Sequence, residues 1–506
     1  MKMVKSLILG SAAGLLAMGG AQAADLPVKA KAVEYVKICS LYGAGFYYIP
    51  GTDTCIKLGG YLRVDLALNG SDYSPGLTSV PAANNRLTNY YYSRSRSDFT
   101  IDTRTATEYG VLRTFADMVF TWTTGAYTGS APGAYSDTLA GAVGGSSIGG
   151  ASLGLYHAFI QFAGFTLGRT VSAFDAPWQS YPAGGPDTLP GGSNHVTGVN
   201  QATYTAQFGN GVSGTISVQD PTLQDTTNIF NLSYFATGSA ANGTQGTNSF
   251  GGTRAPDVIG NILVDQAWGL AKLSVVGHNN HVSYYGTSES TGHPDDKWGF
   301  AVQGALSIKN IPTGAGDVIN LQAVYTDGAS RYNFQSLMPT SFAMYGGTGL
   351  AGAYQSIGLA AVADATYSGV TAATGTQLET VKTWGFRGGY THNWNPNWAS
   401  AIYGAYGQLK YGSAGSATIC TNMVPLLALT GTCNPDFNFA VIGVNTVWTP
   451  VKGFAFTADV NFTHLDQKFS GTITAPAVLG VAKPAAVYEL KDQNAVSVLL
   501  RAQRNW

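Results

Sequence analysis

Segments of about ten residues recur in this chain in which apolar and polar side chains alternate strictly. The clearest is Ile56–Leu68, where Leu62 and Val64 flank Arg63. The same alternation recurs in residues 94–104, 297–309, 454–463 and 495–506. A period of two places successive side chains on opposite faces of a β-strand. The chain is therefore predicted to be an all-β protein whose strands each carry one apolar and one polar face.

The alternation fits two architectures that differ in the direction of the apolar face. A soluble sheet buries that face in a core, whereas a membrane barrel turns it to lipid and the polar face to a wet lumen. Ten residues are enough for a tilted barrel strand to cross a membrane. Only 11% of the residues are charged, compared with about 25% in typical soluble proteins. After the leader, no run approaches 18 apolar residues, which excludes membrane-spanning helices.

The connections between these segments alternate in length. Short connections rich in Gly, Asn and Pro are expected at residues 105–110, 163–164, 209–211, 267–269, 311–316, 395–397 and 450–453. Long polar or Gly-rich segments are expected at residues 70–89, 124–150, 174–197, 221–256, 284–296, 328–379, 412–436 and 468–487. Seven short turns and eight long loops separate about sixteen strands and place every long loop at one end.

This sorting of loops is typical of a transmembrane antiparallel β-barrel with short periplasmic turns and long external loops. A β-sandwich has no reason to sort its loops in this way. We therefore predict a barrel over residues 56–506. Within the long segment 221–256, residues Ile229–Phe235 have an alternative assignment as a strand.

The first residues indicate export. Lys2 and Lys5 precede an apolar run over residues 6–19, and Ala21-Gln22-Ala23 fits a small-residue cleavage site. This is the pattern of a secretory signal peptide over residues 1–23, with the mature chain beginning near Ala24. The alternative, a membrane anchor, is disfavoured because the run is shorter than a spanning helix. The expected location is the bacterial outer membrane.

Four cysteines allow three disulfide connectivities. An oxidising periplasm permits disulfides, and proximity in sequence favours Cys39–Cys55 and Cys420–Cys433. The first pair would close an N-terminal segment over residues 24–55, either periplasmic or lumenal. Neither pair has the CxxC spacing of redox or zinc sites.

Three stretches resemble the alphaproteobacterial porins. They are ADLPVKAKAVEYVKICSLYGAGFYYIPGTDTCIKLGGYLRVD (residues 24–65), DTRTATEYGVLRTF (residues 102–115) and GRTVSAFD (residues 168–175). The resemblance implies a sixteen-stranded homotrimeric barrel in outer-membrane lipid and lipopolysaccharide. It also implies a passive, water-filled pore for small hydrophilic solutes and ions. The alternation alone gives only a barrel with a polar interior.

A barrel of this size encloses an aqueous channel. In the family that the chain resembles, a loop after the fifth strand folds inward and narrows the channel. Counting strands places that loop at residues 174–197, which contain no Lys or Arg. Acid on the loop facing base on the wall would create a transverse field at a constriction. The candidates are Asp175 and Asp187 on the loop and Arg63, Arg94, Arg96 and Arg113 on predicted lumen faces. The alternative is that these are ordinary solvated lumen charges.

Other functions are disfavoured. His278 and His281 are three residues apart, which places them on opposite faces of a strand, so no metal site or other cofactor is expected. The GxGxxG match at Gly347–Gly352 lies in a long loop without strand–helix context. Without Lys2 and Lys5, 25 of the 27 basic residues remain against 28 acidic ones, so nucleic acid is not an expected partner. No enzymatic activity is expected. The alternative function is an outer-membrane barrel that serves as an anchor or adhesin without a pore.

Overall fold

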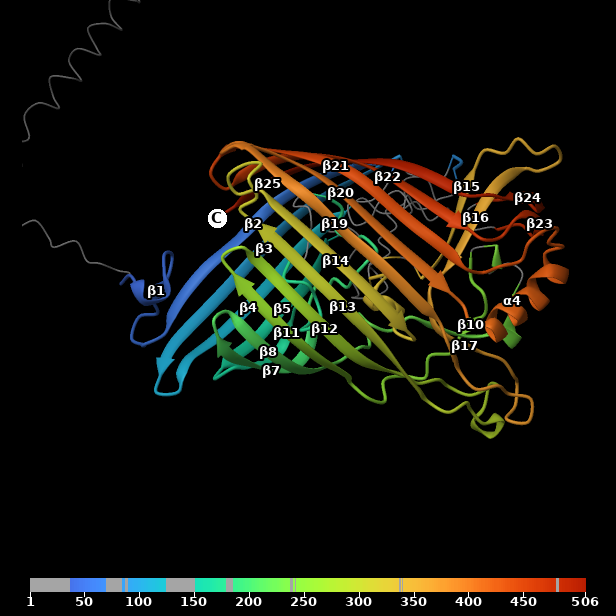
Figure 1. Cartoon of the computed structure of the whole chain (residues 1–506), viewed down its shortest axis with the longest axis horizontal. Helices are drawn as coiled ribbons and strands as arrows, with labels where there is room; N and C mark the ends of the chain where they lie inside the picture. Colours follow the sequence, from blue (N-terminus) through green and yellow to red (C-terminus); the bar gives the residue numbers. More distant parts are fainter. Residues whose placement is uncertain are drawn as a thin grey trace, which may run out of the picture.

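Sixteen antiparallel strands form a closed barrel (Figure 1). The barrel closes because the last strand, β25, pairs with both β22 and the first strand, β2. The strands are β2 (Cys55–Leu68), β3 (Tyr91–Thr107), β4 (Gly110–Thr123), β5 (Ala151–Phe162), β6 (Phe165–Thr170), β7 (Val199–Gly209), β8 (Val212–Gln219), β11 (Asp257–Gln266), β12 (Gly269–Asn280), β13 (Lys297–Lys309), β14 (Val318–Asp327), β19 (Lys382–Asn395), β20 (Trp398–Lys410), β21 (Phe437–Val451), β22 (Phe454–Gln467) and β25 (Gln493–Asn505).

The computed structural model describes residues 37–69, 84–86, 90–123, 151–178, 185–236, 240–241, 243–335, 338, 340–478 and 482–506. The predicted signal peptide, residues 1–23, lies outside these ranges. So do residues 24–36 of the predicted N-terminal segment.

The predicted number of strands and the predicted sorting of loops are confirmed. Each of the seven predicted short turns joins two neighbouring barrel strands, and each predicted long segment joins two strands at the opposite end. In the β7–β8 turn, Asn210 and Gly211 have φ values of 49° and 70°. Tight hairpin turns require this left-handed conformation, which Asn and Gly adopt most readily.

The two faces of the wall follow the sequence alternation. On β13, Trp298, Phe300 and Val302 are exposed on the outside, whereas Gln303 and Ser307 are buried inside. On β22, Val460 points outward and Asn461 inward. An apolar outside and a polar inside is the arrangement of a membrane barrel, and it is the reverse of that in a soluble sheet.

The long loops carry structure of their own. One small sheet contains β10 (Thr247–Asn248), β9 (Asn228–Asn231), β17 (Ala363–Tyr367) and β18 (Glu379–Thr380). A second contains β15 (Ser341–Gly346), β16 (Gln355–Ala361), β24 (Ala486–Leu490) and β23 (Gly471–Ala475). The alternative strand at Ile229–Phe235 is thus partly formed as β9, but it belongs to a loop sheet and is followed by a 3₁₀ turn, η3 (Leu232–Tyr234).

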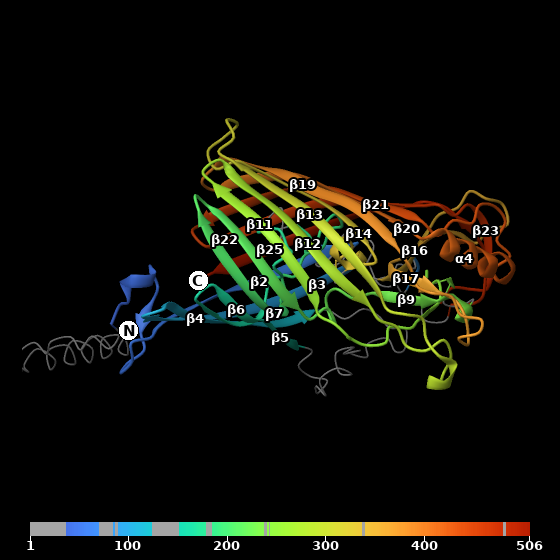
Figure 2. The same ribbon diagram turned by 60° about the horizontal axis from the view of Figure 1, so that its bottom comes forward.

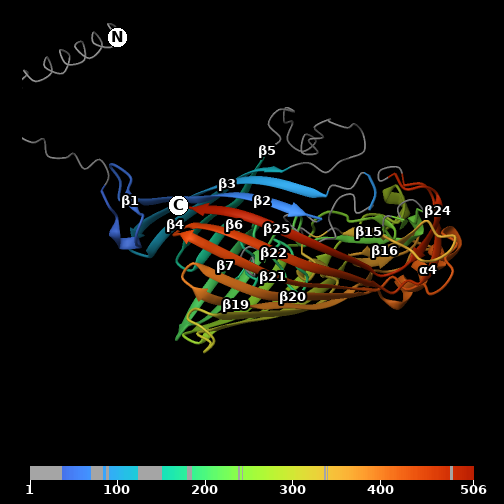
Figure 3. The same cartoon turned by 90° about the horizontal axis from the view of Figure 1, so that it is seen from above.

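Helix α4 (Ser413–Leu426) belongs to the same structured loops, and the predicted Cys420–Cys433 disulfide ties it to the segment that follows. Figure 2 shows α4 and β23 beyond the long-loop ends of β20 and β21, and Figure 3 shows α4 in the same place. Apolar side chains such as Phe342, Ile357 and Ile419 form a core between these loops. Among the described residues, no helix is both long and apolar enough to span a membrane.

The N-terminal residues form a small clip at the opposite, short-turn end. β1 (Tyr47–Tyr48) pairs with the start of β2 and makes a seventeenth strand in the sheet. The predicted Cys39–Cys55 disulfide is confirmed and packs against Phe46. The C-terminus lies at this end too, because the backbone N–H of Trp506 donates to the carbonyl of Gly60.

Candidate pore constriction and its two walls

Among the described residues, the long loop that connects β6 to β7 packs inside the barrel, beside Tyr332 of the β14–β19 loop. It spans residues 171–198, of which 179–184 lie outside the described ranges, and is called the inward loop below. Phe174 near its start is fully buried and packs against Ile259 on β11, Val276 on β12 and Ala301 on β13. Because these partners lie on the inner face of the barrel, the loop is packed against the β11–β13 side of the lumen.

Side chains from that side also bind the backbone of the loop. Lys272 Nζ donates to the carbonyl oxygens of Ala173 at 2.8 Å and Asp175 at 2.6 Å. Arg387 Nη2 on β19 donates to the carbonyl of Ser193 at 2.8 Å. A loop without regular structure leaves carbonyls unpaired, so donors from the wall stabilise it inside the barrel. The inner faces of β11–β14 and β19 are called the docking wall below.

Glycine allows the loop to approach the docking wall closely. Gly191 has a φ of +93°, and a Cβ at this position would lie 2.3 Å from the carbonyl carbon of Phe386 on β19. The adjacent Gly192 would meet the side chain of Gln322 at 2.0 Å. Any larger residue at Gly191 would therefore both strain the backbone and push the loop away from the wall.

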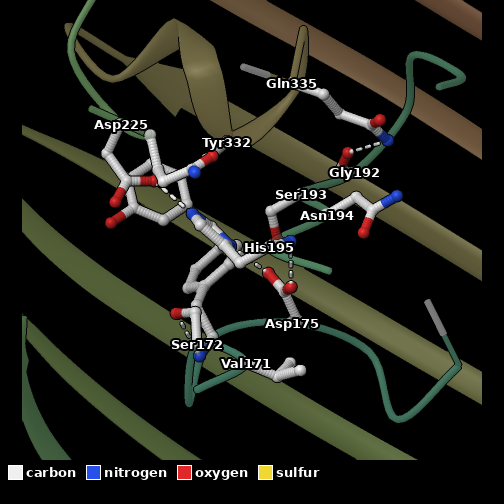
Figure 4. A network of polar contacts seen from close by, with 12 residues as sticks. Val171, Ser172, Asp175, Gly192, Ser193, Asn194, His195, Asp225, Tyr332 and Gln335 are labelled. Atoms are coloured by element: carbon white, nitrogen blue, oxygen red, sulfur yellow. Dashed lines mark hydrogen bonds and ion pairs between the residues drawn. The ribbon is translucent and has the colours of Figure 1, made fainter. Parts of the chain in front are cut away.

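A buried histidine fixes the two ends of the inward loop to each other and to a second loop (Figure 4). His195 Nδ1 lies 2.6 Å from Asp175 Oδ1, and His195 Nε2 lies 2.6 Å from Asp225 Oδ1. Burial by itself lowers the pKa of His195, but the two carboxylates raise it well above its usual value. The same contacts hold the pKa of Asp175 below its usual range despite its burial. His195 is therefore a doubly donating imidazolium, and the three residues are called the histidine clamp.

Further polar contacts extend from the clamp. Gln219 Nε2 donates to Asp225 at 2.8 Å and to the hydroxyl of Tyr332 at 2.9 Å. Tyr332 in turn donates to Asp257 at 2.6 Å. His278 binds this same Asp257, whereas His281 binds Asp296. The two histidines of the HNNH stretch thus have separate partners, and the described residues contain no cluster of His, Cys, Asp or Glu suited to a metal ion.

The opposite side of the lumen carries arginines. Asp65 on β2 accepts from Arg94 Nη2 on β3 at 2.7 Å and from Arg501 Nε on β25 at 2.6 Å. Asp187 reaches this group from the inward loop, with its carboxylate 3.4 Å from Arg94 and 3.8 Å from both Arg63 and Arg501. Burial would raise the pKa of Asp187, but the arginines lower it to about 2. The inner faces of β2–β5 and β25 are called the charged wall below.

A cavity of about 250 Å³ remains between the inward loop and the charged wall. Two arginine–tyrosine pairs border it, since the Arg63 guanidinium lies 5.4 Å from the Tyr61 ring and that of Arg96 lies 5.8 Å from the Tyr156 ring. This cavity is called the passage below. Its lining consists of Tyr61, Arg63, Arg96, Asp98, Asp117, Tyr156 and His157 from the wall and Asp187, Val196 and Thr197 from the loop.

The structure brings together four of the six charged residues proposed from the sequence. Arg63, Arg94, Arg96 and Asp187 lie at the passage or directly behind it. Arg113 lies nearer the short-turn end, where it binds Asp102 at 3.0 Å. Asp175 lies on the docking side in the histidine clamp.

Sequence reasoning missed several members of these sites. Arg501 occupies a lumen position of the last strand, but its contact with Asp65 arises only when β25 pairs with β2. His195 and Asp225 lie in loops without periodicity. Lys272 and Arg387 could have been recognised by their position on inner faces, but no pattern indicates that they bind backbone carbonyls.

A closed barrel with an apolar outside, a polar lumen and a loop folded inward defines an outer-membrane β-barrel channel. Residues 25–499 match the sequence model of the family described as Porin subfamily, and the chain belongs to this family. Porin Omp2b of Brucella abortus (strain 2308) is 31% identical over 337 residues, which cover 64% of this chain and 85% of that protein. Porin Omp2b of Brucella melitensis is 30% identical with the same coverage.

The fold resembles that of a solved outer-membrane channel. The outer membrane channel DcaP of Acinetobacter baumannii aligns with a TM-score of 0.53 at 16% identity and covers 91% of this chain and 99% of that one. The chain is thus a porin of the outer membrane, as its sequence predicts.

Proposed function

We propose that the passage is the constriction of a passive diffusion channel for small hydrophilic solutes and ions, without a catalytic step. The observation that carries this proposal is the cavity of about 250 Å³ between the inward loop and the charged wall. The loop is held by the docking wall and reaches the charged wall through Asp187, and the cavity lies beside that contact. Charged and hydroxyl groups line that cavity, so a polar solute can exchange water contacts for wall contacts, whereas an apolar solute cannot.

We further propose that permeating solutes contact Arg63 and Arg96 on the wall. Arg94 does not contact solutes but binds the carboxylates that lie beside these two residues. Arg94 is completely buried between Asp65 and Asp187, whereas Arg63 and Arg96 border the cavity. Asp187 touches three arginines directly at 3.4 to 3.8 Å. At these distances no water separates the carboxylate of Asp187 from the arginines. The negative charge of the loop is therefore neutralised by direct contact and does not face the wall across an open lumen.

Single-channel recording in planar bilayers tests this assignment. The expected result is ohmic conductance steps for the wild type and a changed reversal potential in a salt gradient for Arg63→Gln. The matched control is Arg254→Gln, because Arg254 is exposed on a long loop outside the passage. An absence of current from correctly folded protein would refute the channel, and equal reversal potentials in all three proteins would remove Arg63 from the constriction.

We also propose that the porin is a homotrimer, with its long loops in the lipopolysaccharide leaflet. Support comes from the outer face of β3, where Ser95 and Ser97 lie among apolar neighbours. Ser95 stands between Val64 on β2 and Trp122 on β4. Hydroxyls facing hydrocarbon are costly, whereas a neighbouring copy of the chain can supply hydrogen-bond partners.

Light scattering of the detergent-solubilised protein tests the trimer. Ser95→Trp places a large side chain in this region and should convert trimers to monomers. Ile262→Trp is the matched control, because Ile262 is an exposed outer residue of β11. A trimer that survives Ser95→Trp would place the interface elsewhere, and a monomeric wild type would refute the oligomer.

A further inference from the structure

A second stretch of chain lies inside the barrel, next to the inward loop. It consists of residues 330–335 of the loop between β14 and β19, begins with the 3₁₀ turn η5 (Ser330–Tyr332), and is called the supporting segment below. All of its residues are buried. The ring of Tyr332 lies 4.6 Å from that of Phe174, and both pack against the inner faces of β11–β14. External loops ordinarily run over the surface, so this segment is structured to lie in the lumen.

The supporting segment binds the backbone of the inward loop. The N–H of Gly191 donates to Asn333 Oδ1 at 2.9 Å. Gln335 Nε2 donates to the carbonyl of Gly192 at 3.0 Å (Figure 4). Asp187, which reaches the charged wall, lies four residues before Gly191. Because buried backbone groups need partners, these two side chains determine where this part of the inward loop lies.

The barrel wall leaves space where the two segments meet. At Gly385 on β19, a Cβ would lie 2.5 Å from Asn333 Oδ1 and 3.0 Å from Gly191 Cα. At Gly407 on β20, a Cβ would lie 2.9 Å from the ring of Phe334. Both glycines face the lumen, and neither has a positive φ, so the backbone does not require glycine there. Their small size is what allows the supporting segment and the inward loop to pack together against the wall.

The supporting segment is anchored to the external loops. Asp364 on β17 accepts from the N–H of Ser330 at 2.6 Å and from its hydroxyl at 2.8 Å. The same carboxylate accepts from the N–H of Thr227, at the start of the β8–β11 loop sheet, at 3.0 Å. Arg331 Nη1 donates to the carbonyl of Gln335 at 2.7 Å and so keeps the segment folded on itself. Hydrogen bonds therefore lead from an external sheet to the inward loop.

We propose that Asn333 and Gln335 are positioning residues of the constriction. They hold the inward loop where the carboxylate of Asp187 meets the arginines of the charged wall, and the width of the passage depends on this position. Loss of the contact between Asp364 and Ser330 therefore changes the constriction from a distance. This inference rests on the proposed function, because it takes the passage to be the constriction.

Single-channel conductance and the size limit for neutral solutes test the role of Gln335. Gln335→Met keeps the length of the side chain and removes the donor to Gly192, so the loop should detach, the conductance should rise and larger solutes should pass. Gln377→Met is the matched control, because Gln377 is exposed on the same loop. Gln335→Glu is the second variant if Gln335→Met does not fold. A purely structural role would lower the melting temperature alone, so a wild-type conductance and size limit in the folded variant would overturn the proposal.

Labelling of a thiol reports the position of the loop without any solute flux. Ser193 on the inward loop is 1% exposed. Ser193→Cys introduces a free thiol, because the four native cysteines form two disulfides. Loss of a buried hydrogen bond shifts a local opening equilibrium by about tenfold, so a polar thiol reagent should label Cys at 193 about tenfold faster with Gln335→Met than with Gln377→Met. Equal labelling rates would overturn the proposal.

The remote contact has its own variant. Asp364→Leu removes the acceptor of Ser330 and Thr227 and should also accelerate labelling at position 193. Asp295→Leu is the control, because Asp295 is exposed on a neighbouring long loop. Equal labelling rates in these two variants would overturn the connection to the external sheet.

The two readouts separate this inference from the proposed function. If labelling responds to Gln335→Met but folded wild-type protein passes no current, the proposed channel fails and the loop is still positioned by the supporting segment. If the wild type conducts but Gln335→Met changes neither labelling nor conductance, the channel stands and the positioning role is refuted.

Discussion

The inward loop touches two walls of one lumen, and the walls differ in how their polar residues are used. On the docking wall, Lys272, Arg387 and Gln303 donate hydrogen bonds to backbone carbonyls of the loop. On the charged wall, Arg63 and Arg96 contact side chains and border an open cavity. Both walls show the same alternation in sequence. A polar residue on a lumen face therefore either holds the loop in position or is available to contact a solute. Only its contacts in the structure show which of the two roles it has.

The largest expected effect comes from breaking the histidine clamp. His195→Leu would leave Asp175 and Asp225 buried without their shared cation, which costs about 3–5 kcal/mol. The loop should detach from the docking wall, so single-channel conductance should rise and fluctuate. His293→Leu is the control, since His293 is exposed on a long loop. A quiet channel of wild-type conductance after His195→Leu would contradict the role of the clamp.

A smaller effect is expected where the loop touches β19. Gly191→Val combines a left-handed backbone with a Cβ that meets Phe386, and such overpacking costs about 1–3 kcal/mol. We expect a lower melting temperature and altered conductance. At Gly349 a Cβ would meet no atom within 4 Å, so Gly349→Val should behave as the wild type. Equal melting temperatures for the two variants would show that the loop does not depend on this close approach.

Two arginines test the comparison of the walls directly. Arg96→Gln removes a charge that borders the passage and should shift the reversal potential toward cation preference. Arg387→Gln removes the donor to Ser193, which costs about 1–3 kcal/mol and should disturb the loop without changing ion preference. Reversal potentials and current noise recorded on both variants separate the two roles. An equal shift of the reversal potential in both variants would mean that the two walls contribute alike to ion preference.

The smallest effect expected is the response to mild acid. Asp187 has a folded pKa of about 2, below its ordinary value of 3.8. Its contribution to stability is therefore present above about pH 4 and is lost as the pH falls toward 2. His195 has a raised pKa, so its contribution is present at neutral pH and is lost only as the pH rises through that folded value. Conductance recorded from pH 4 to 7 should therefore show no transition caused by Asp187 or His195. A transition in this range that the wild type shows and Asp187→Asn lacks would contradict the expectation.

Most of the barrel can be predicted from the sequence because its rules are local. The alternation in Ile56–Leu68 and the Asn210-Gly211 turn depend only on neighbouring residues. The resemblance to porins implies that a loop after the fifth strand folds inward, and counting strands then locates that loop in the sequence. The small loop sheets cannot be predicted in this way, because β9 pairs in parallel with β17, more than a hundred residues away, and neither strand alternates.

The site is predicted less completely than the barrel. The alternation places Arg63, Arg94 and Arg96 on the lumen face, and Asp187 lies in the loop that the resemblance to porins implies is folded inward. The alternation does not indicate which wall the loop will contact, so the sequence does not distinguish Asp175 from Asp187, although they lie on opposite sides of the lumen. The contacts of His195 with Asp175 and Asp225 span 20 and 30 residues of irregular chain.

Closure of the barrel has a consequence for its biogenesis. Asp65 and Arg501 are 436 residues apart in sequence and meet only when β25 docks against β2. Until then, Asp65 lacks one of its two closest cations and Asp187 one of its three. The final strand therefore completes the hydrogen-bonded wall and the electrostatic balance of the passage in the same step. A chain truncated before β25 would lose both the strand pairing that closes the barrel and the contacts of Arg501 with Asp65 and Asp187.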